Sequence, residues 1–68
     1  MNPHKMLAIR ALRHMLARSY TDKLRKELKG RNMNEQYAHS GKTCAEVLAA
    51  YIRKDDEIIE AIDWIKSL

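Results

Sequence analysis

Residues 43–68 hold the feature that most constrains the fold, a sustained helical repeat of apolar side chains. At about 100° of rotation per residue, one side of a helix carries the apolar set and polar residues take most of the other. The apolar set is Cys44, Val47, Leu48, Tyr51, Ile58, Ile62 and Ile65. Thr43, with Glu46 three residues later, forms a capping-box pattern directly before this repeat. We therefore expect a helix over residues 43–67 that needs a partner surface.

A second apolar repeat runs through the first part of the chain. Its members recur at intervals of three or four residues: Met6, Ile9, Leu12, Leu16, Tyr20, Leu24 and Leu28. Asn2 and Pro3 suit the N-cap and the first helical position, and Gly30 suits a left-handed cap at the end. The pattern predicts one helix over residues 3–29. A capping pattern that begins at Ser19 leaves open the alternative of a break there.

Residues 31–42 connect the two expected helices. They are rich in Asn, Ser and Gly and hold no sustained period, which is typical of a loop. Within this loop we expect one helical turn over residues 35–39, closed by Gly41.

Two helices of about 25 residues with a short connection predict an all-α fold, a long antiparallel hairpin that forms a single domain over residues 1–68. Ile52 and Ile59 widen the second apolar face beyond what one partner helix covers. We therefore expect two copies to pair as a four-helix bundle. A monomeric three-helix fold is the alternative if the chain turns a corner at Ser19 or Asp55.

The residues expected in the core or the dimer contact lie on these two apolar faces. They are Ile9, Leu12, Leu16, Tyr20, Leu24, Val47, Leu48, Tyr51, Ile58, Ile62 and Ile65. Asp55 interrupts the second face, so the helix either bends or restarts near it. A carboxylate on this side is expected to find a cationic or backbone partner, or to lie at the edge of the core.

The net charge of +4 is divided unevenly along the chain. Residues 1–31 carry nine basic and two acidic residues, a net charge of +7, whereas residues 32–68 carry four basic and seven acidic residues, a net charge of −3. In a continuous first helix, one side carries Arg10, His14, Arg18, Arg25 and Lys29. This row predicts contact with nucleic-acid phosphates. The alternative is an outer face that is solvated or paired with the acids of the later helix.

Trp64 lies off the main apolar face of the later helix. It falls on the side of Glu57 and Glu60, close to Leu68. Because tryptophan is enriched among interface hot spots, we expect this set to bind a partner protein. Coverage of the hairpin end, or a place in the dimer contact, are the other roles open to Trp64.

The chain offers no pattern for catalysis or for a metal. His39 and Cys44 lack a third, orienting group, and no set of four ligands has the compact spacing of structural zinc. Cys44 is expected to be a small buried hydrophobe. Residues 41–43 resemble the tail of a phosphate-binding loop, but the glycine required five residues earlier is Gln36. Residues 35–53 depart from the helix-turn-helix pattern, because Lys42 stands where that pattern has an apolar residue.

These features predict a small, non-enzymatic regulatory protein that binds a partner macromolecule as a homodimer. No signal peptide or membrane span is visible and the chain has one cysteine, so we expect a soluble, cytoplasmic protein. No cofactor, small-molecule substrate or membrane contact is expected, and the size suits a bacterial or phage accessory protein. The alternative is a nucleic-acid-binding protein that contacts phosphates through Arg10, Arg18 and Arg25.

Overall fold

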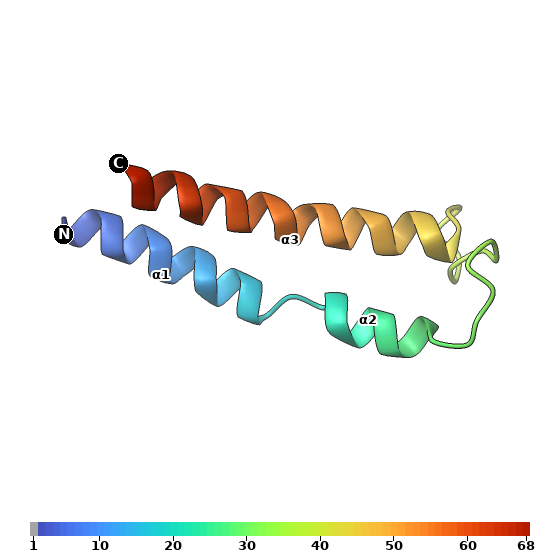
Figure 1. The fold of residues 1–68 in the computed structure, drawn as a ribbon. Coiled ribbons are helices and arrows are strands. Elements are labelled where there is room, and N and C mark those ends of the chain that lie inside the picture. Colours follow the sequence, from blue (N-terminus) through green and yellow to red (C-terminus); the bar gives the residue numbers. More distant parts are fainter. Residues whose placement is uncertain (1) are drawn as a thin grey trace. The chain divides into compact units, whose positions relative to one another are not determined.

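The computed structural model describes residues 2–68, which form three α-helices: α1 (Pro3–Ala17), α2 (Thr21–Leu28) and α3 (Cys44–Ser67) (Figure 1). The chain divides into two compact units. Unit 1 comprises Met1–Ser19 and Lys54–Leu68, and unit 2 comprises Tyr20–Arg53. In unit 1, α1 runs antiparallel to the later part of α3, and in unit 2, α2 runs antiparallel to the earlier part. The predicted all-α class and the packing of helices against each other are confirmed.

The first helix begins where the sequence predicts. Asn2 has an extended backbone, and its Oδ1 accepts a hydrogen bond of 2.9 Å from the backbone N–H of His4. Pro3 takes the first helical position, where its missing N–H leaves no bond unmade.

The expected single helix over residues 3–29 is wrong. The first helix ends at Ala17, and a new one begins at Thr21. Figure 1 shows the non-helical segment between them. The alternative break near Ser19 is the one present, although the N-cap of α2 is Tyr20, which makes no side-chain capping bond.

Two hydroxyl groups beside the break bond to α3. In unit 1, the Ser19 hydroxyl donates a hydrogen bond of 2.7 Å to Oδ1 of Asp55. In unit 2, Thr21 is buried and its hydroxyl donates a long hydrogen bond of 3.5 Å to the backbone carbonyl of Tyr51. Both bonds join residues next to the break to α3, at Asp55 in unit 1 and Tyr51 in unit 2. Asp55 thereby has a hydroxyl partner.

A tight turn ends α2. Lys29 has φ −60° and ψ 126°, Gly30 has φ 82°, and the Arg31 N–H donates a bond of 3.0 Å to the carbonyl of Leu28. These values define a type II turn, in which the third position needs a positive φ. Gly30 therefore has the predicted left-handed backbone.

The connection to α3 folds as a short hairpin, so the helical turn expected over residues 35–39 is wrong. An isolated antiparallel bridge joins Gln36 to Thr43. Beside it, Cys44 N–H donates to the Glu35 carbonyl at 2.8 Å, and Tyr37 N–H donates to the Lys42 carbonyl at 2.9 Å. The tip reverses with a positive φ at Ala38 and at Gly41, of 48° and 74°.

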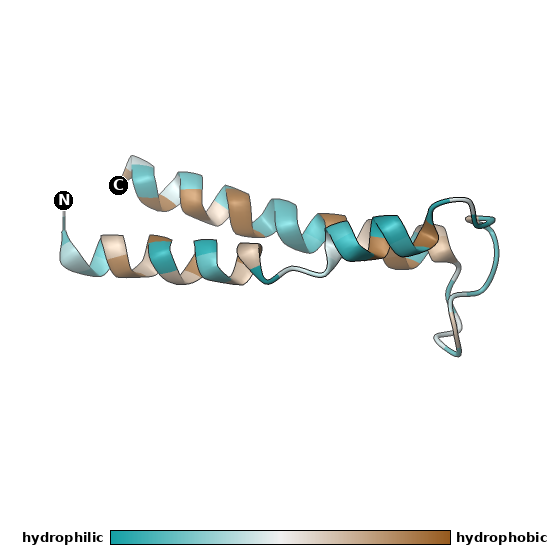
Figure 2. Cartoon of the chain, turned by 90° about the horizontal axis from the view of Figure 1, so that it is seen from below, coloured by the Kyte–Doolittle hydropathy of each residue, from teal (hydrophilic) through white to brown (hydrophobic). Residues whose placement is uncertain are grey.

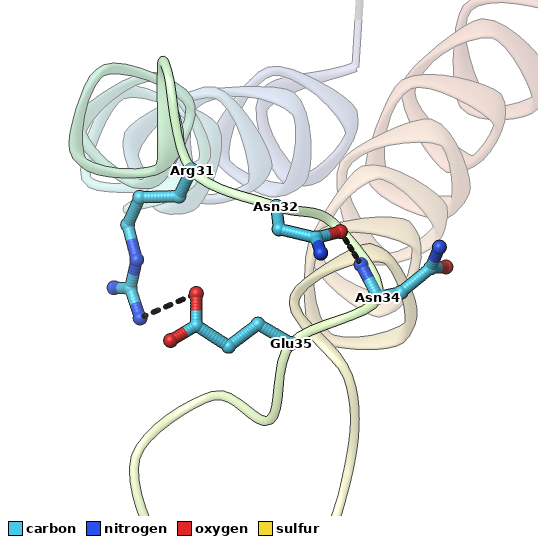
Figure 3. Close-up of polar contacts among 4 residues, drawn as sticks. All are labelled: Arg31, Asn32, Asn34 and Glu35. Atoms are coloured by element: carbon cyan, nitrogen blue, oxygen red, sulfur yellow. Dashed lines mark hydrogen bonds and ion pairs between the residues drawn. The ribbon is translucent and has the colours of Figure 1, made fainter.

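Local polar contacts shape the start of this connection (Figure 3). Asn32 Oδ1 accepts a bond of 2.9 Å from the Asn34 N–H, which is the geometry of an Asx turn. Arg31 and Glu35 form an exposed ion pair at 4.0 Å. The backbone groups of Glu35 and Tyr37 bond across the hairpin to Cys44 and Lys42, so they are not available for a helical turn over residues 35–39.

The predicted capping box at the start of α3 is confirmed. Thr43 Oγ1 accepts a bond of 3.2 Å from the Glu46 N–H, and Glu46 Oε1 accepts bonds of 3.1 Å from both the N–H and the hydroxyl of Thr43. From there α3 continues through Asp55 to Ser67 without a restart.

Each unit has its own small core. The isoleucine core of unit 1 consists of Ile9, Ile58 and Ile62, with Leu12, Leu16 and Ile65 partly buried against it. The core of unit 2 consists of Leu24, Leu28 and Cys44, with Met33, Tyr37, Val47 and Leu48 packed against it. Tyr20 and Tyr51, which the sequence pattern assigned to the apolar faces, are 43% and 37% exposed. Figure 2 shows hydrophobic and hydrophilic residues following each other along α1 and α3, as expected for helices that carry both kinds in every turn and bury one side.

Candidate interaction surfaces

A cationic cleft lies in unit 1 between α1 and the last turns of α3. Its volume is about 260 Å³, and its described lining consists of Met6, Ile9, Arg10, Arg13 and Lys66. Met6, Arg10 and Arg13 follow at helical spacings of four and three, so they share one side of α1. Within residues 2–68, none of Arg10, Arg13 and Lys66 has a carboxylate within 4.0 Å.

An apolar strip lies on the side of unit 1 opposite the cleft. At about 100° of rotation per residue, Leu12 falls on the other side of the core residue Ile9 from Arg13, and Ile65 falls on the other side of Ile62 from Lys66. Helical spacing extends this row, and we define the apolar strip as Ala8, Leu12, Met15, Ala61 and Ile65. Its members are half-buried except Met15, which is 52% exposed. The helix pair alone does not cover this side.

The set predicted around Trp64 lies on one exposed side of α3 in unit 1. Trp64 is 64% exposed and Leu68 69% exposed, with Glu57 and Glu60 exposed beside them. The Ser67 hydroxyl donates a bond of 2.6 Å to the Trp64 carbonyl. We call these four residues, Glu57, Glu60, Trp64 and Leu68, the tryptophan face. It combines two large apolar side chains with two carboxylates.

The predicted row of cations does not lie along one helix. Arg10, His14 and Arg18 belong to α1 and its C-cap in unit 1, whereas Arg25 and Lys29 belong to α2 and its cap in unit 2. All five are exposed. The row was inferred from a continuous helix, and the break at residues 18–20 removes that premise.

The N-terminus of α3 has no N–H group free for an anion in its first turn. Cys44 and Ala45 donate to the carbonyls of Glu35 and Met33, at 2.8 and 3.0 Å, and Glu46 donates to the Thr43 hydroxyl. A phosphate-binding loop needs these groups pointing at the ligand. Gly41 therefore belongs to the turn before α3 and not to a phosphate-binding loop.

Residues with catalytic or metal-binding chemistry are dispersed. Among residues 2–68, no group of three or more His, Cys, Asp or Glu side chains is arranged to hold a metal ion. Cys44 is fully buried in the core of unit 2, whereas His39 is exposed at the tip of the connection. His39 and Cys44, the pair weighed as base and nucleophile from the sequence, therefore differ in exposure, and the thiol lies within the core.

A tyrosine cluster surrounds Glu27 in unit 2. Its Oε2 accepts bonds from the hydroxyls of Tyr20 and Tyr37, at 3.3 and 3.4 Å, and the rings of Tyr20 and Tyr51 are 6.3 Å apart. The negative charge of Glu27 is the main cause that raises the pKa of Tyr20, followed by burial. Burial is the main cause that raises the pKa of Tyr37, followed by the charge of Glu27. Spacing along the sequence did not reveal this cluster, because Tyr37 reaches it from the connection.

The sequence also missed most of the cleft. Met6 and Arg10 appeared in separate patterns, apolar and cationic, while Arg13 and Lys66 appeared in none. Lys66 joins them because α3 returns antiparallel to α1 within unit 1. The charge asymmetry of the chain was the available signal, but it does not say which side chains converge.

Compared with known proteins, the chain matches no family model, no curated protein and no solved structure. None of the helices within residues 2–68 combines the length and hydrophobicity required to span a bilayer.

Proposed function

We propose that the protein is a small, non-catalytic helical protein that forms a homodimer and binds a partner macromolecule. The apolar strip of unit 1 is the observation that carries this proposal. A pair of antiparallel helices buries one side of each helix, and the strip leaves Leu12 and Ile65 half-exposed and Met15 mostly exposed. Small domains of this length commonly gain the missing burial from a second copy.

The shape of the strip favours a second copy as its cover. Two helices from each copy form a four-helix bundle when their uncovered apolar sides meet, and a twofold axis makes one patch complementary to itself. Ala8 and Ala61 provide small side chains that let the helices of the second copy approach closely. The larger Leu12, Met15 and Ile65 fill the space between them.

Sedimentation across a concentration series tests the dimer. We expect reversible association of the wild-type chain, and weakening by at least about tenfold in Met15→Glu, because a buried carboxylate without a partner is costly. Leu7→Glu is the matched control, since Leu7 is 57% exposed on α1 but lies outside the strip. A chain that remains monomeric at every concentration, or a Met15→Glu variant that associates as well as wild type, contradicts the proposal.

The tryptophan face is assigned to the partner macromolecule. Trp64 supplies a large apolar surface and Glu57 and Glu60 supply charge, a combination suited to a protein surface with a cationic rim. Affinity capture from the native host, after nuclease digestion, is expected to recover a partner with wild-type protein and to lose it with Trp64→Ala. Leu7→Ala serves as control, and retention of every captured protein by folded Trp64→Ala contradicts the assignment.

Nucleic-acid binding is the second candidate, favoured by the composition of α1. Residues 3–17 contain no acidic residue, and Arg10, His14 and Arg18 keep helical spacings of four on one side. The affinity of such a row for nucleic-acid phosphates falls steeply as the salt concentration rises. A gel-shift titration at two salt concentrations separates the candidates. Binding that weakens steeply with salt supports this one, and no binding at low salt removes it.

A further inference from the structure

We propose that the cationic cleft of unit 1 binds a small amphiphilic anion, a carboxylate carried on a short apolar chain. This site is distinct from the apolar strip and the tryptophan face, and it goes beyond the proposed interaction function. Its ligand is a small molecule.

The positive charges around the cleft favour an anionic ligand. Arg10, Arg13 and Lys66 converge on one hollow from two helices, and within residues 2–68 none has a carboxylate within 4.0 Å. Asp63, one turn before Lys66 on α3, lies beyond that distance from each of them. A bound anion forms charge-assisted hydrogen bonds with these exposed cations. The planar guanidinium groups of Arg10 and Arg13 match a carboxylate in two-point contacts.

The remainder of the lining calls for an apolar chain. Two apolar side chains line the cleft, Ile9, which is 6% exposed, and Met6, which is 49% exposed. Methionine is unbranched and polarisable, so Met6 can adjust to ligands of differing shape. A mostly apolar lining with a few convergent polar groups is the usual composition of a small-molecule site.

The volume limits the ligand. At about 260 Å³, the cleft falls below the range typical of sites for drug-sized molecules, so it suits a short chain with one acidic head. A nucleic-acid strand needs cations spaced along a path, whereas these three surround one hollow. A single anionic group with an apolar tail satisfies both parts of the lining.

Titration of the full-length protein with octanoate, followed by NMR of the backbone amides, tests the site. We expect saturable shifts centred on Met6, Arg10 and Lys66. Octanol and inorganic phosphate, which each supply half of the chemistry, should bind at least about tenfold more weakly, because each loses one set of contacts. Equal binding of octanol would reduce the cleft to an apolar patch and overturn the proposal.

Two variants and a matched control locate the site. Arg10→Gln with Arg13→Gln should weaken octanoate binding by about tenfold or more, since two charge-assisted contacts are lost. Arg18→Gln with Arg25→Gln removes the same charge outside the cleft and should leave binding unchanged. Circular dichroism checks folding, and Lys66→Gln replaces the first double variant if that one unfolds.

Other results of the octanoate and DNA titrations would also overturn the proposed anion site. No saturable octanoate binding, or equal binding by the cleft variants and wild type, overturns the proposal. Salt-sensitive binding of a short single-stranded DNA, lost with Arg10→Gln and Arg13→Gln while octanoate does not bind, overturns it in favour of a polyanion surface. Because octanoate binding is read independently of sedimentation, failure here leaves the dimer proposal standing.

Discussion

Unit 1 and unit 2 use the same long helix, yet they bury their side chains to different degrees. In unit 2, the side chains of Leu24 and Cys44 are fully buried. In unit 1, every member of the isoleucine core remains between 6% and 8% exposed, and the apolar strip is uncovered. The difference comes from a third segment of chain. Residues 29–43 add Met33 and Tyr37 to the core of unit 2, whereas no connection folds over the helices of unit 1.

Two helices alone leave their apolar sides partly exposed, and a short irregular segment completes the core of unit 2. The connection of unit 2 also satisfies the first N–H groups of α3, so it seals the helix end and the apolar side together. Unit 1 therefore carries both the candidate surfaces for other molecules and the weaker packing of its own residues. The surfaces that unit 1 offers to other molecules are exposed because no further segment within residues 2–68 covers its two helices.

Truncation of a core leucine in each unit gives the largest expected difference. Leu24→Ala removes a fully buried side chain from unit 2, and we expect it to lower the free energy of unfolding by about 2–5 kcal/mol. Leu12→Ala removes a half-buried one from unit 1, and should cost about 1 kcal/mol as measured at low, monomeric concentration. Urea unfolding followed by circular dichroism measures both. Equal losses would show that the burial difference between the units has no energetic counterpart.

Removal of the capping box should have a smaller effect, confined to unit 2. Thr43→Ala deletes the hydroxyl that accepts the Glu46 N–H, and we expect a loss of about 1 kcal/mol. The backbone N–H of Thr43, and then its hydroxyl, lower the pKa of Glu46. This contribution to stability is present above the ordinary pKa of a glutamate and is lost as the pH falls through the lowered value.

A pair of variants isolates the acid-sensitive part. Glu46→Gln removes the titrating group, so its urea midpoint should change less between neutral and acidic pH than that of wild type. Glu57→Gln, an exposed glutamate of unit 1, is the control and should follow wild type. If Glu46→Gln shows the full acid sensitivity of wild type, the capping carboxylate is not its source.

The smallest expected effect concerns the tyrosines, all three of which lie in unit 2. The pKa values of Tyr20 and Tyr37 are raised, so stability is complete below the ordinary tyrosine pKa and declines as the pH rises through the raised values. Absorbance of tyrosinate should show Glu27→Gln lowering the pKa of Tyr20 more than that of Tyr37, because charge is the first cause only for Tyr20. Glu60→Gln, in unit 1, should leave the titration unchanged. A titration insensitive to Glu27 would argue against the cluster.

The starts of α1 and α3 were predictable because their caps depend on residues close in sequence. Thr43 with Glu46 and Asn2 with Pro3 each act within a few residues, and the structure has both caps. The break at residues 18–20 was only an alternative, since the acceptors of the Ser19 and Thr21 hydroxyls, on Asp55 and Tyr51, are 36 and 30 residues away along the chain. Periodicity records which side of a helix is apolar, but it does not record which hydroxyl finds an acceptor.

The candidate surfaces were predictable to the extent that each lies on one helix. The tryptophan face is set by the spacing of Trp64 from Glu60 and Leu68 on α3. The cleft was missed because Arg13 and Lys66 meet only through packing within unit 1. The hairpin of the connection was missed because the bonds of Glu35 and Tyr37 to residues 42–44 carry no compositional signal.

Cys44 offers an experimental opportunity that follows from its position. It is the single thiol of the chain, and it lies fully buried where α3 begins. A thiol reagent therefore reacts only with molecules in which that end of the protein has opened. The reaction rate measures how often this opening occurs. Cys44 thus serves as a native probe of local unfolding at the start of α3, and no label has to be introduced.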